Sequence, residues 1–370
     1  MTDSVVLFDE IKTAGGQRFA VATLNAPASL NALSVDMVRL LTPKLREWAS
    51  DAGIVGVLLQ AAGEKAFCAG GDLRQLYQTL LDCGPERNTY AEDFFREEYE
   101  LDYLIHTFPK PFLCWGHGIV MGGGVGLLAG ASHRVMTLQS RIAMPEINIG
   151  LYPDVGGSWF LGRMPGRCGL FLALTGAPLN AADACFAGLA DHVLRHEEQG
   201  AVLEAIARER WDGAQAADSA RLARLLASFE TARPDSPLRA HLDRIDAVIG
   251  RDGLDALAPR LAALAHDADP WLAAAGAAFA KGSPTSARLA VELQRRARHL
   301  SLADVFRLEY RASVGCCVHA DFAEGVRALL VDKDKSPRWQ RATLAEVDDA
   351  FVDAHLAPRF EGAHPLADLP

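Results

Sequence analysis

The sequence predicts an α/β core followed by a helical region, and two observations support this. Five β-rich runs occur early, each bounded by glycine, proline or polar residues: VVLFD, FAVATLN, IVGVLLQ, FLCWGHGIV and RVMTL. After about residue 200 the composition changes to alanine, arginine and leucine, with almost no β-branched runs. We therefore expect an α/β core at residues 1–200, with strands joined by crossovers, and a helical region at residues 201–370 that packs on it.

The first helix is predicted between the second and third strand runs. Ser34 is placed to cap it, and Pro43 is expected to kink or break it. Its apolar residues recur at helical spacing, at Val38, Leu41, Leu45 and Trp48. In the second half, the breakers PDSP and KGSP divide the helical region, and residues 301–304 (SLAD) form a predicted capping box.

Composition limits the possible functions. Half of the 370 residues are apolar, which is enough for a sizeable core. The formal charge of −10 disfavours a general nucleic-acid or anionic-membrane surface, so no nucleic-acid partner is expected. No apolar run reaches the roughly 18 residues of a membrane span, and the start MTDSVVLFDE lacks the pattern of a secretory signal. We expect a cytoplasmic protein without a membrane partner.

The cysteines predict free thiols rather than disulfides or a metal site. They are odd in number and never spaced C-x-x-C. The seven are Cys68, Cys83, Cys114, Cys168, Cys185, Cys316 and Cys317. We therefore expect no structural zinc.

Two glycine-rich segments could hold an anionic or polarised group. KAFCAGGDL, at 65–73, follows a strand and exposes main-chain N–H groups around Gly70 and Gly71. WGHGIVMGGGVGLLAG, at 115–130, leads into a helix but does not fit G-x-G-x-x-G, because position 127 is Leu127. A helix N-terminus suited to an oxyanion remains. By themselves, a simple turn and close helix packing explain these glycines equally well.

A third segment, AMPEINIGLYPDVGG at 143–157, places two acids among apolar residues, prolines and glycines. Glu146 and Asp154 could serve catalysis, cap helices or pair with buried arginines, and the segment alone leaves these interpretations open. Ser158 lies outside a G-x-S-x-G motif, and no H-E-x-x-H occurs. A structural role is expected for His117, His133 and His192.

Together and in this order, the segments resemble the crotonase, or enoyl-CoA hydratase/isomerase, superfamily. The matching stretches are LNAPASLNALSVDM, AFCAGGDL, GHGIVMGGGVGL, AMPEINIGLYPDVGG and FLALTGAPLNAADACFAGLADHVL. The resemblance implies a ββα superhelix core and an acyl-CoA thioester as the small-molecule substrate. It also implies an oxyanion hole formed by the N–H groups of Gly71 and Gly123, because a carbonyl that becomes tetrahedral needs two fixed donors.

One position separates this chain from the hydratases of the superfamily. These resemble one another in a glutamate two residues past the GGG run, where this chain has Gly126. Their second acid matches Glu146, and Asp154 is an addition. This combination resembles the 3-hydroxyisobutyryl-CoA hydrolase branch, as do FFREEYELDYLI, KGSPTSARLA, SLADVFRLEYR and HADFAEGVRALLVDKDKSPRW. The resemblance covers nearly all of residues 5–345 and implies that Glu98 contacts the substrate.

The resemblance implies hydrolysis of a 3-hydroxyacyl-CoA, most simply the 3-hydroxyisobutyryl thioester of valine catabolism. Glu146 would attack the carbonyl or act as general base, and the sequence leaves both routes open. Asp154 could donate a proton to the departing thiol, orient water or bind the 3-hydroxyl, and positioning of water and substrate is the favoured role. The alternatives are hydration or isomerisation of an enoyl-CoA, and non-catalytic binding of acyl-CoA. A 3-hydroxypropionyl group differs by one methyl, so the acyl group also stays open.

The phosphates of CoA require a local basic surface on this acidic chain. Lys65, Arg74, Lys333 and Lys335 are the candidates, the last two because LLVDKDKSP resembles the family's CoA-flanking segment. The helical region would then complete the CoA site. CoA is part of the substrate, so no separate cofactor and no metal are expected. A homo-oligomer formed through the carboxy-terminal helices and a monomer in which these helices cover that surface both stay open.

Overall fold

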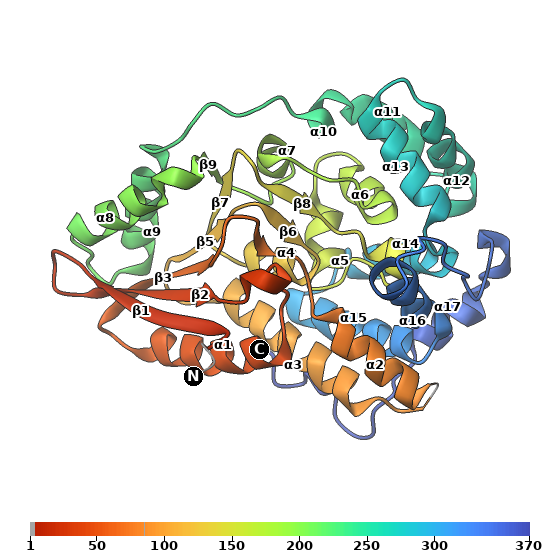
Figure 1. Ribbon diagram of the computed structural model, residues 1–370, viewed down its shortest axis with the longest axis horizontal. Coiled ribbons are helices and arrows are strands. Elements are labelled where there is room, and N and C mark those ends of the chain that lie inside the picture. The colour runs from red at the N-terminus through yellow and green to blue at the C-terminus, as the bar shows by residue number, and fades with distance from the viewer. Residues whose placement is uncertain (1–3, 85) are drawn as a thin grey trace. The chain divides into compact units, whose positions relative to one another are not determined.

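The computed structural model describes residues 4–84 and 86–370, which divide into two units (Figure 1). The first holds residues 1–71, 101–142 and 179–236, and the second holds residues 72–100, 143–178 and 237–370. Each unit therefore gathers three separate stretches of the chain. The division into an α/β core at 1–200 and a helical region at 201–370 stays a prediction about folding units.

A six-stranded sheet forms the centre of the first unit. Its order is β1 (Val6–Lys12), β2 (Arg18–Leu24), β3 (Ile54–Ala61), β5 (Phe112–Gly116), β7 (His133–Thr137) and β9 (His192–Leu194). The β1–β2 pair is antiparallel, and the remaining pairs are parallel. All five predicted strand runs are confirmed, and FLCWGHGIV supplies two strands because the chain turns at Gly118, where φ is +58°.

A second sheet of three short strands carries the glycine-rich segments. Its order is β4 (Ala66–Cys68), β6 (Ile119–Met121) and β8 (Arg141–Ala143), and β4 and β6 run parallel. Parallel strands end at the same edge of a sheet. The residues that follow β4 and β6, which include Gly71 and Gly123, therefore emerge together.

Helices cover the six-stranded sheet of the first unit (Figure 1). They are α1 (Val35–Ser50), α4 (Gly123–Ala129), α7 (Ala181–Phe186), α8 (Gln199–Arg208) and α9 (Gln215–Ala227). Apolar residues of α8 and α9 form one buried cluster with Phe19, Trp115 and other sheet residues. Ser34 caps α1 as predicted, its side chain accepting the N–H of Met37. Pro43 does not break the helix, which continues to Ser50.

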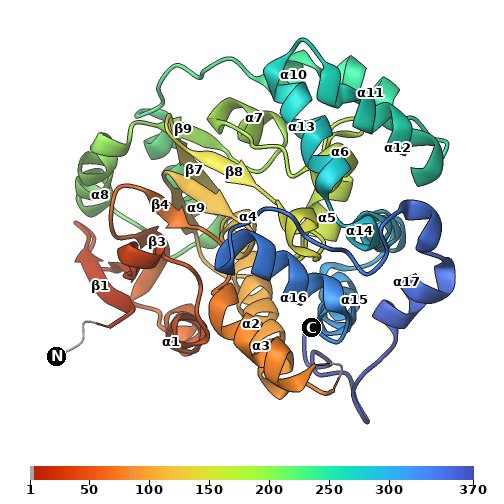
Figure 2. The ribbon, with the colours of Figure 1, turned by 45° about the vertical axis from the view of Figure 1, so that its right-hand side comes forward.

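The second unit is built mainly from helices (Figure 2). They are α2 (Leu73–Cys83), the first part of α3 (Thr89–His106), α5 (Gly157–Phe160), α6 (Cys168–Thr175), α10 (Pro237–Ala240), α11 (Leu242–Ile249), α12 (Leu254–Ala263), α13 (Pro270–Lys281), α14 (Pro284–Ala297), α15 (Leu302–Cys317), α16 (Ala320–Val326) and α17 (Asp349–Leu356). The helical character expected after residue 200 is confirmed. None of the helices in residues 4–84 and 86–370 is both long and apolar enough to cross a bilayer.

Helix α15 is buried around most of its circumference, so it lies in the core of the second unit. Ser301 caps it by accepting the N–H of Asp304. In a capping box the acid would accept the N–H of Ser301, but here the Asp304 carboxylate accepts the Ser301 hydroxyl. The predicted capping box is therefore only half formed.

Two glycines let α16 approach the 3₁₀ turn η2 (Glu146–Ile149) closely. A Cβ on Gly150, where φ is +72°, would lie 2.2 Å from the carbonyl oxygen of Asp321. A Cβ on Gly325 would lie 2.3 Å from the carbonyl carbon of Ile149. Neither position has room for a side chain, so the backbones of η2 and α16 are in direct contact.

Candidate functional site

Three buried acids gather in the second unit, and we call Glu98, Glu146 and Asp154 the acid cluster. Glu98 lies on α3, Glu146 opens η2, and Asp154 lies in the turn before α5; their exposed fractions are 2%, 4% and 5%. Within the part of the chain that the structure describes, Oε1 of Glu98 and Oε2 of Glu146 have no hydrogen-bond partner. Buried carboxylate oxygens without partners are costly and mark a candidate functional site.

Burial and mutual repulsion shift the proton affinities of these acids. Burial raises the pKa of Glu146 well above its usual range, and the charges of Asp154 and Glu98 raise it further. Burial and the charge of Asp154 likewise raise the pKa of Glu98. Burial raises the pKa of Asp154 to about 6, although a hydrogen bond from Tyr99 opposes the rise. Carboxyl groups whose pKa values are perturbed in this way are typical of sites of acid–base catalysis.

A chain of buried hydroxyl groups leads from Asp154 to helix α15. The Tyr99 hydroxyl donates to Asp154 Oδ2 at 2.8 Å and lies 2.7 Å from Ser313 Oγ. Ser313 Oγ also lies 2.8 Å from the hydroxyl of Tyr152, which donates to the Glu309 carbonyl at 2.7 Å. These contacts fix the orientation of the Asp154 carboxylate.

The turn that carries Asp154 has an unusual backbone. The N–H of Gly157 donates to the Asp154 carbonyl at 2.6 Å and closes the turn. Val155 and Gly156 both adopt left-handed φ values, +51° and +85°. That conformation is rare for a β-branched residue such as valine, so the turn needs support from outside.

Glu309 supplies contacts to this turn from α15. Its carboxylate accepts the N–H of Gly156 at 2.7 Å and that of Ser158 at 2.8 Å. Its side chain is fully buried, and burial raises the pKa of Glu309 to about 8, opposed by the hydrogen bonds from Ser158 and Gly156.

The first unit holds the other predicted site residues, in what we call the glycine corner: residues 68–71 at the end of β4 and 121–124 at the end of β6. Gly70, with φ +107°, lies against Met121, since its Cβ would be 3.4 Å from that carbonyl oxygen. A Cβ on Gly124 would lie 2.4 Å from the Cys68 carbonyl oxygen. Close packing of α4 on β4 thus requires glycine at 124.

The predicted oxyanion donors meet at this corner. No hydrogen bond between described residues uses the N–H of Gly71 or of Gly123. Gly123 is the first residue of α4, where N–H groups lack partners within the helix. The structure therefore groups Gly71 with Gly123 in the first unit, and Glu98 with Glu146 and Asp154 in the second.

The four basic residues expected to bind CoA are all exposed. Lys65 precedes β4 in the first unit, whereas Arg74 on α2, Lys333 and Lys335 belong to the second. Arg327 pairs with Asp332 and Asp334, which alternate with the two lysines. In residues 4–84 and 86–370, none of the four basic residues forms an ion pair. They are available to a ligand carrying negative charge.

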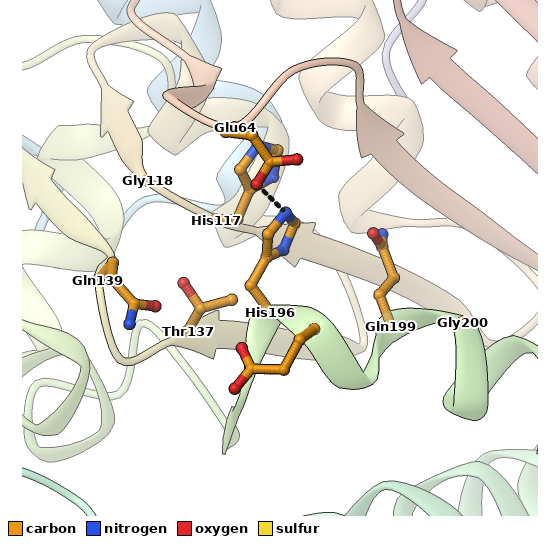
Figure 3. A pocket seen from close by; sticks show the side chains of 9 residues that line it. Glu64, His117, Gly118, Thr137, Gln139, His196, Gln199 and Gly200 are labelled. Atoms are coloured by element: carbon orange, nitrogen blue, oxygen red, sulfur yellow. Dashed lines mark ion pairs between the residues drawn. The ribbon is translucent and has the colours of Figure 1, made fainter.

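A separate pocket of about 510 Å³ lies in the first unit and contains no predicted site residue (Figure 3). His117 and His196 stack there with ring centroids 4.4 Å apart. His196 Nδ1 accepts the indole N–H of Trp115, and its Nε2 lies 3.6 Å from Glu64. His117 Nε2 lies 2.7 Å from the Gly63 carbonyl oxygen. These rings are held by internal partners, which agrees with a structural role for His117.

The other two histidines have structural partners, and the cysteines are free thiols. His133 Nε2 lies 2.9 Å from the Ser219 carbonyl oxygen, and His192 pairs with Glu230, so both have structural partners. All seven cysteines are free thiols, as predicted, and Cys83 and Cys185 are partly exposed while the other five are buried.

Sequence reasoning missed four residues around the acids: Tyr99, Tyr152, Glu309 and Ser313. Tyr152 lies within the third segment, but nothing in that segment distinguishes it from a core tyrosine. Glu309 carried a signal that could have been used: it lies four residues after Val305 and four before Ser313, on a face of α15 that is buried throughout. A charged residue on a buried face indicates a specific partner.

Curated proteins similar to this chain are named 3-hydroxyisobutyryl-CoA hydrolase, mitochondrial. The protein from Danio rerio is 39% identical over 355 residues, covering 95% of this chain and 88% of that protein. The protein from Homo sapiens is 36% identical over 341 residues, covering 91% and 85%. The cytoplasmic location expected above is contradicted by these relatives, which are named as mitochondrial. That expectation rested on the composition of the first residues, which is a weak guide to compartment.

Solved structures give the same fold with other names. An enoyl-CoA hydratase from Rhodobacter sphaeroides 2.4.1 has a TM-score of 0.83 and 35% identity, and covers 96% of this chain and 98% of its own. A carnitinyl-CoA dehydratase from Mycobacterium thermoresistibile has a TM-score of 0.84 and 38% identity, covering 96% and 97%. The predicted α/β fold with a helical carboxy-terminal region is confirmed. A family model described as enoyl-CoA hydratase/isomerase matches residues 19–356, and the chain belongs to that family.

Proposed function

We propose that this protein hydrolyses an acyl-CoA thioester, with 3-hydroxyisobutyryl-CoA as substrate. The observation that carries the proposal is the placement of the carboxylates. Gly126 lies buried within α4 and offers no acid, whereas Glu146 and Asp154 lie buried in the acid cluster. The acid that hydratases carry at position 126 is thus missing, and Asp154, which the resemblance gives as an addition of the hydrolase branch, is present beside Glu146. The hydrolase names of the vertebrate relatives support the same substrate.

The glycine corner would polarise the thioester carbonyl. The N–H groups of Gly71 and Gly123 would donate to its oxygen as the carbon becomes tetrahedral. Each fixed donor of this kind lowers a barrier by roughly 3 to 4 kcal/mol, because it needs no reorganisation during the reaction. No side chain takes part in this step.

Glu146 would then begin the bond exchange by one of two routes. In the first, its carboxylate attacks the carbonyl carbon, the C–S bond breaks with release of CoA thiolate, and water opens the mixed anhydride. In the second, Glu146 accepts a proton from the water that attacks the carbonyl carbon, and the C–S bond then breaks with release of CoA thiolate. The unpartnered Oε2 of Glu146 supports either route, because a carboxylate oxygen that is already bonded would have to release its partner first.

Asp154 would position water and the hydroxyacyl group. Its Oδ2 is held by Tyr99, so the group has a fixed direction. CoA thiol leaves about as readily as a cysteine thiol with a pKa near 8.5, so strong acid assistance is not required.

Lys65, Arg74, Lys333 and Lys335 would hold the CoA phosphates, and their exposure without ion pairs supports this. A homo-oligomer is a further part of the proposal, and light scattering after size exclusion tests it. The carboxy-terminal helices of each subunit would form the contact between subunits.

Release of free thiol is the test of the proposed function. Purified protein is assayed with 3-hydroxyisobutyryl-CoA, 3-hydroxypropionyl-CoA and crotonyl-CoA, following thiol with a chromogenic disulfide and the enoyl group by absorbance. Thiol release with the first substrate, abolished in Glu146→Ala, is the expected result. Loss of enoyl absorbance from crotonyl-CoA without thiol release would instead identify a hydratase. Binding of acyl-CoA without either change would identify a non-catalytic binder.

A further inference from the structure

We propose that Glu309 and Ser313 of α15 are positioning residues for Asp154. Glu309 would hold the main chain of the Asp154 turn, and Ser313 would hold the carboxylate through Tyr99. This inference rests on the proposed function, since it assigns Asp154 a part in thioester hydrolysis.

The Glu309 carboxylate caps α5 from another helix. Gly156 precedes α5 and Ser158 is its second residue, and the structure shows no side-chain cap within residues 156–160. The two carboxylate oxygens bind different donors, Oε2 accepting from Gly156 and Oε1 from Ser158. Hydrogen bonds from backbone N–H groups to a carboxylate are short and strong, so the end of the turn that leads into α5 is fixed.

The backbone at and just before the first of these contacts explains why such support is needed. Val155 adopts φ +51°, a conformation in which its β-branched side chain is crowded, and Gly156 follows at φ +85°. A strained turn persists only where its surroundings determine it. Without the Glu309 contacts, residues 154–156 can relax toward ordinary backbone conformations and carry the Asp154 carboxylate with them.

Ser313 supports the carboxylate of Asp154, whereas Glu309 supports the main chain of its turn. It lies one helical turn after Glu309 and therefore on the same face of α15. Its hydroxyl contacts both Tyr99 and Tyr152, and Tyr99 donates to Asp154. One face of α15 thus supports Asp154 in two ways. Glu309 contacts the main chain of the turn, and Ser313 contacts Tyr99, which donates to the Asp154 carboxylate.

Glu309→Gln and Ser313→Ala test the proposal. The glutamine side chain would keep one acceptor and set an NH₂ against a backbone N–H, so one of the two turn contacts is lost. We expect kcat for thiol release to fall roughly 10- to 100-fold while KM stays within about 2-fold, because small misplacements of reacting groups cost rate. Ser313→Ala should lower kcat in the same direction by a smaller factor. Hydrogen exchange in a peptide covering 153–158 should accelerate in Glu309→Gln.

Val305→Ala is the matched control, since Val305 is fully buried on the same helix and takes no part in these polar contacts. It should lower the unfolding midpoint with kcat unchanged. The proposal is overturned if folded Glu309→Gln keeps full kcat, or if Val305→Ala loses kcat to the same extent. If Glu309→Gln does not fold, unchanged kcat in Ser313→Ala overturns it. If the wild type releases no thiol from any acyl-CoA, the proposed function fails, and exchange at 153–158 still decides whether Glu309 holds the turn.

Discussion

The glycine corner and the acid cluster use opposite means to place reactive groups. The corner works through the absence of side chains: Gly70 allows an unusual backbone conformation, and Gly124 allows α4 to contact β4. The acid cluster works through side chains, and Asp154 depends on residues from α3 and α15. Main-chain donors are sensitive to bulky side chains added beside them, whereas side-chain acids are sensitive to the loss of their partners. Variants can therefore distinguish the glycine corner from the acid cluster.

The largest effect is expected from Glu146→Gln in the acid cluster. The amide keeps the shape of the side chain but can neither attack nor accept a proton, so kcat should fall about 10³-fold or more. Thiol release at saturating substrate measures it. Glu86→Gln, on an exposed acid, is the control and should keep full activity. An active Glu146→Gln enzyme would remove Glu146 from the mechanism.

The second-largest effect is expected from Gly123→Val, which disrupts the glycine corner. The added side chain would exclude the substrate carbonyl from its donors, with a loss of roughly 100- to 1,000-fold in kcat. Gly123→Ala should lose much less. Gly200→Ala is the control, because a Cβ at Gly200 meets no atom within 4 Å. Equal activity of the wild type and Gly123→Val would contradict a main-chain oxyanion hole at this position.

Tyr99→Phe should have a smaller effect that depends on pH. The hydrogen bond from Tyr99 lowers the pKa of Asp154, which burial raises to about 6, so removing the hydroxyl should raise this pKa. If Asp154 works ionised, the acid limb of the kcat profile moves to higher pH. Activity should then fall several-fold near pH 6 and little near pH 8.

The pH profile of kcat, compared with that of Tyr77→Phe, measures this effect. Tyr77 lies on α2 and outside the hydroxyl chain around Asp154. An acid limb that stays in place, or that moves to lower pH, would show that Tyr99 does not control Asp154.

The smallest effect is expected from the double variant Lys333→Ala/Lys335→Ala, which leaves the glycine corner and the acid cluster intact. Exposed charges contribute weakly, so KM should rise only about 2- to 5-fold with kcat unchanged, and added salt should reduce the difference. Lys44→Ala, which removes a lysine paired with Glu47, is the control. A change in kcat would place these lysines nearer the chemistry than CoA binding requires.

Much of the fold, and the candidate residues of the glycine corner and the acid cluster, could be predicted because their signals are local. Strand runs, the Ser34 cap and the glycine pattern each lie within a few neighbouring residues. The support of Asp154 could not be predicted in this way, because Tyr99 and Ser313 lie 55 and 159 positions away from it. The helical spacing of Glu309 indicates that it is buried and needs a partner, but it does not identify that partner. Pro43 and the half-formed capping box show the same limit on a smaller scale, since tertiary packing overrode local preference.

The contact between Gly150 and the Asp321 carbonyl bears on the order in which parts of the chain can fold during synthesis. Glu146 opens a turn whose far end is closed by backbone more than 170 residues later. During synthesis, the glycine corner has all its residues once position 124 has emerged, whereas the η2 turn must wait for α16. Ribosome-bound chains that end before about residue 325 would therefore expose the acids to water. The acid cluster would become buried only near the end of translation.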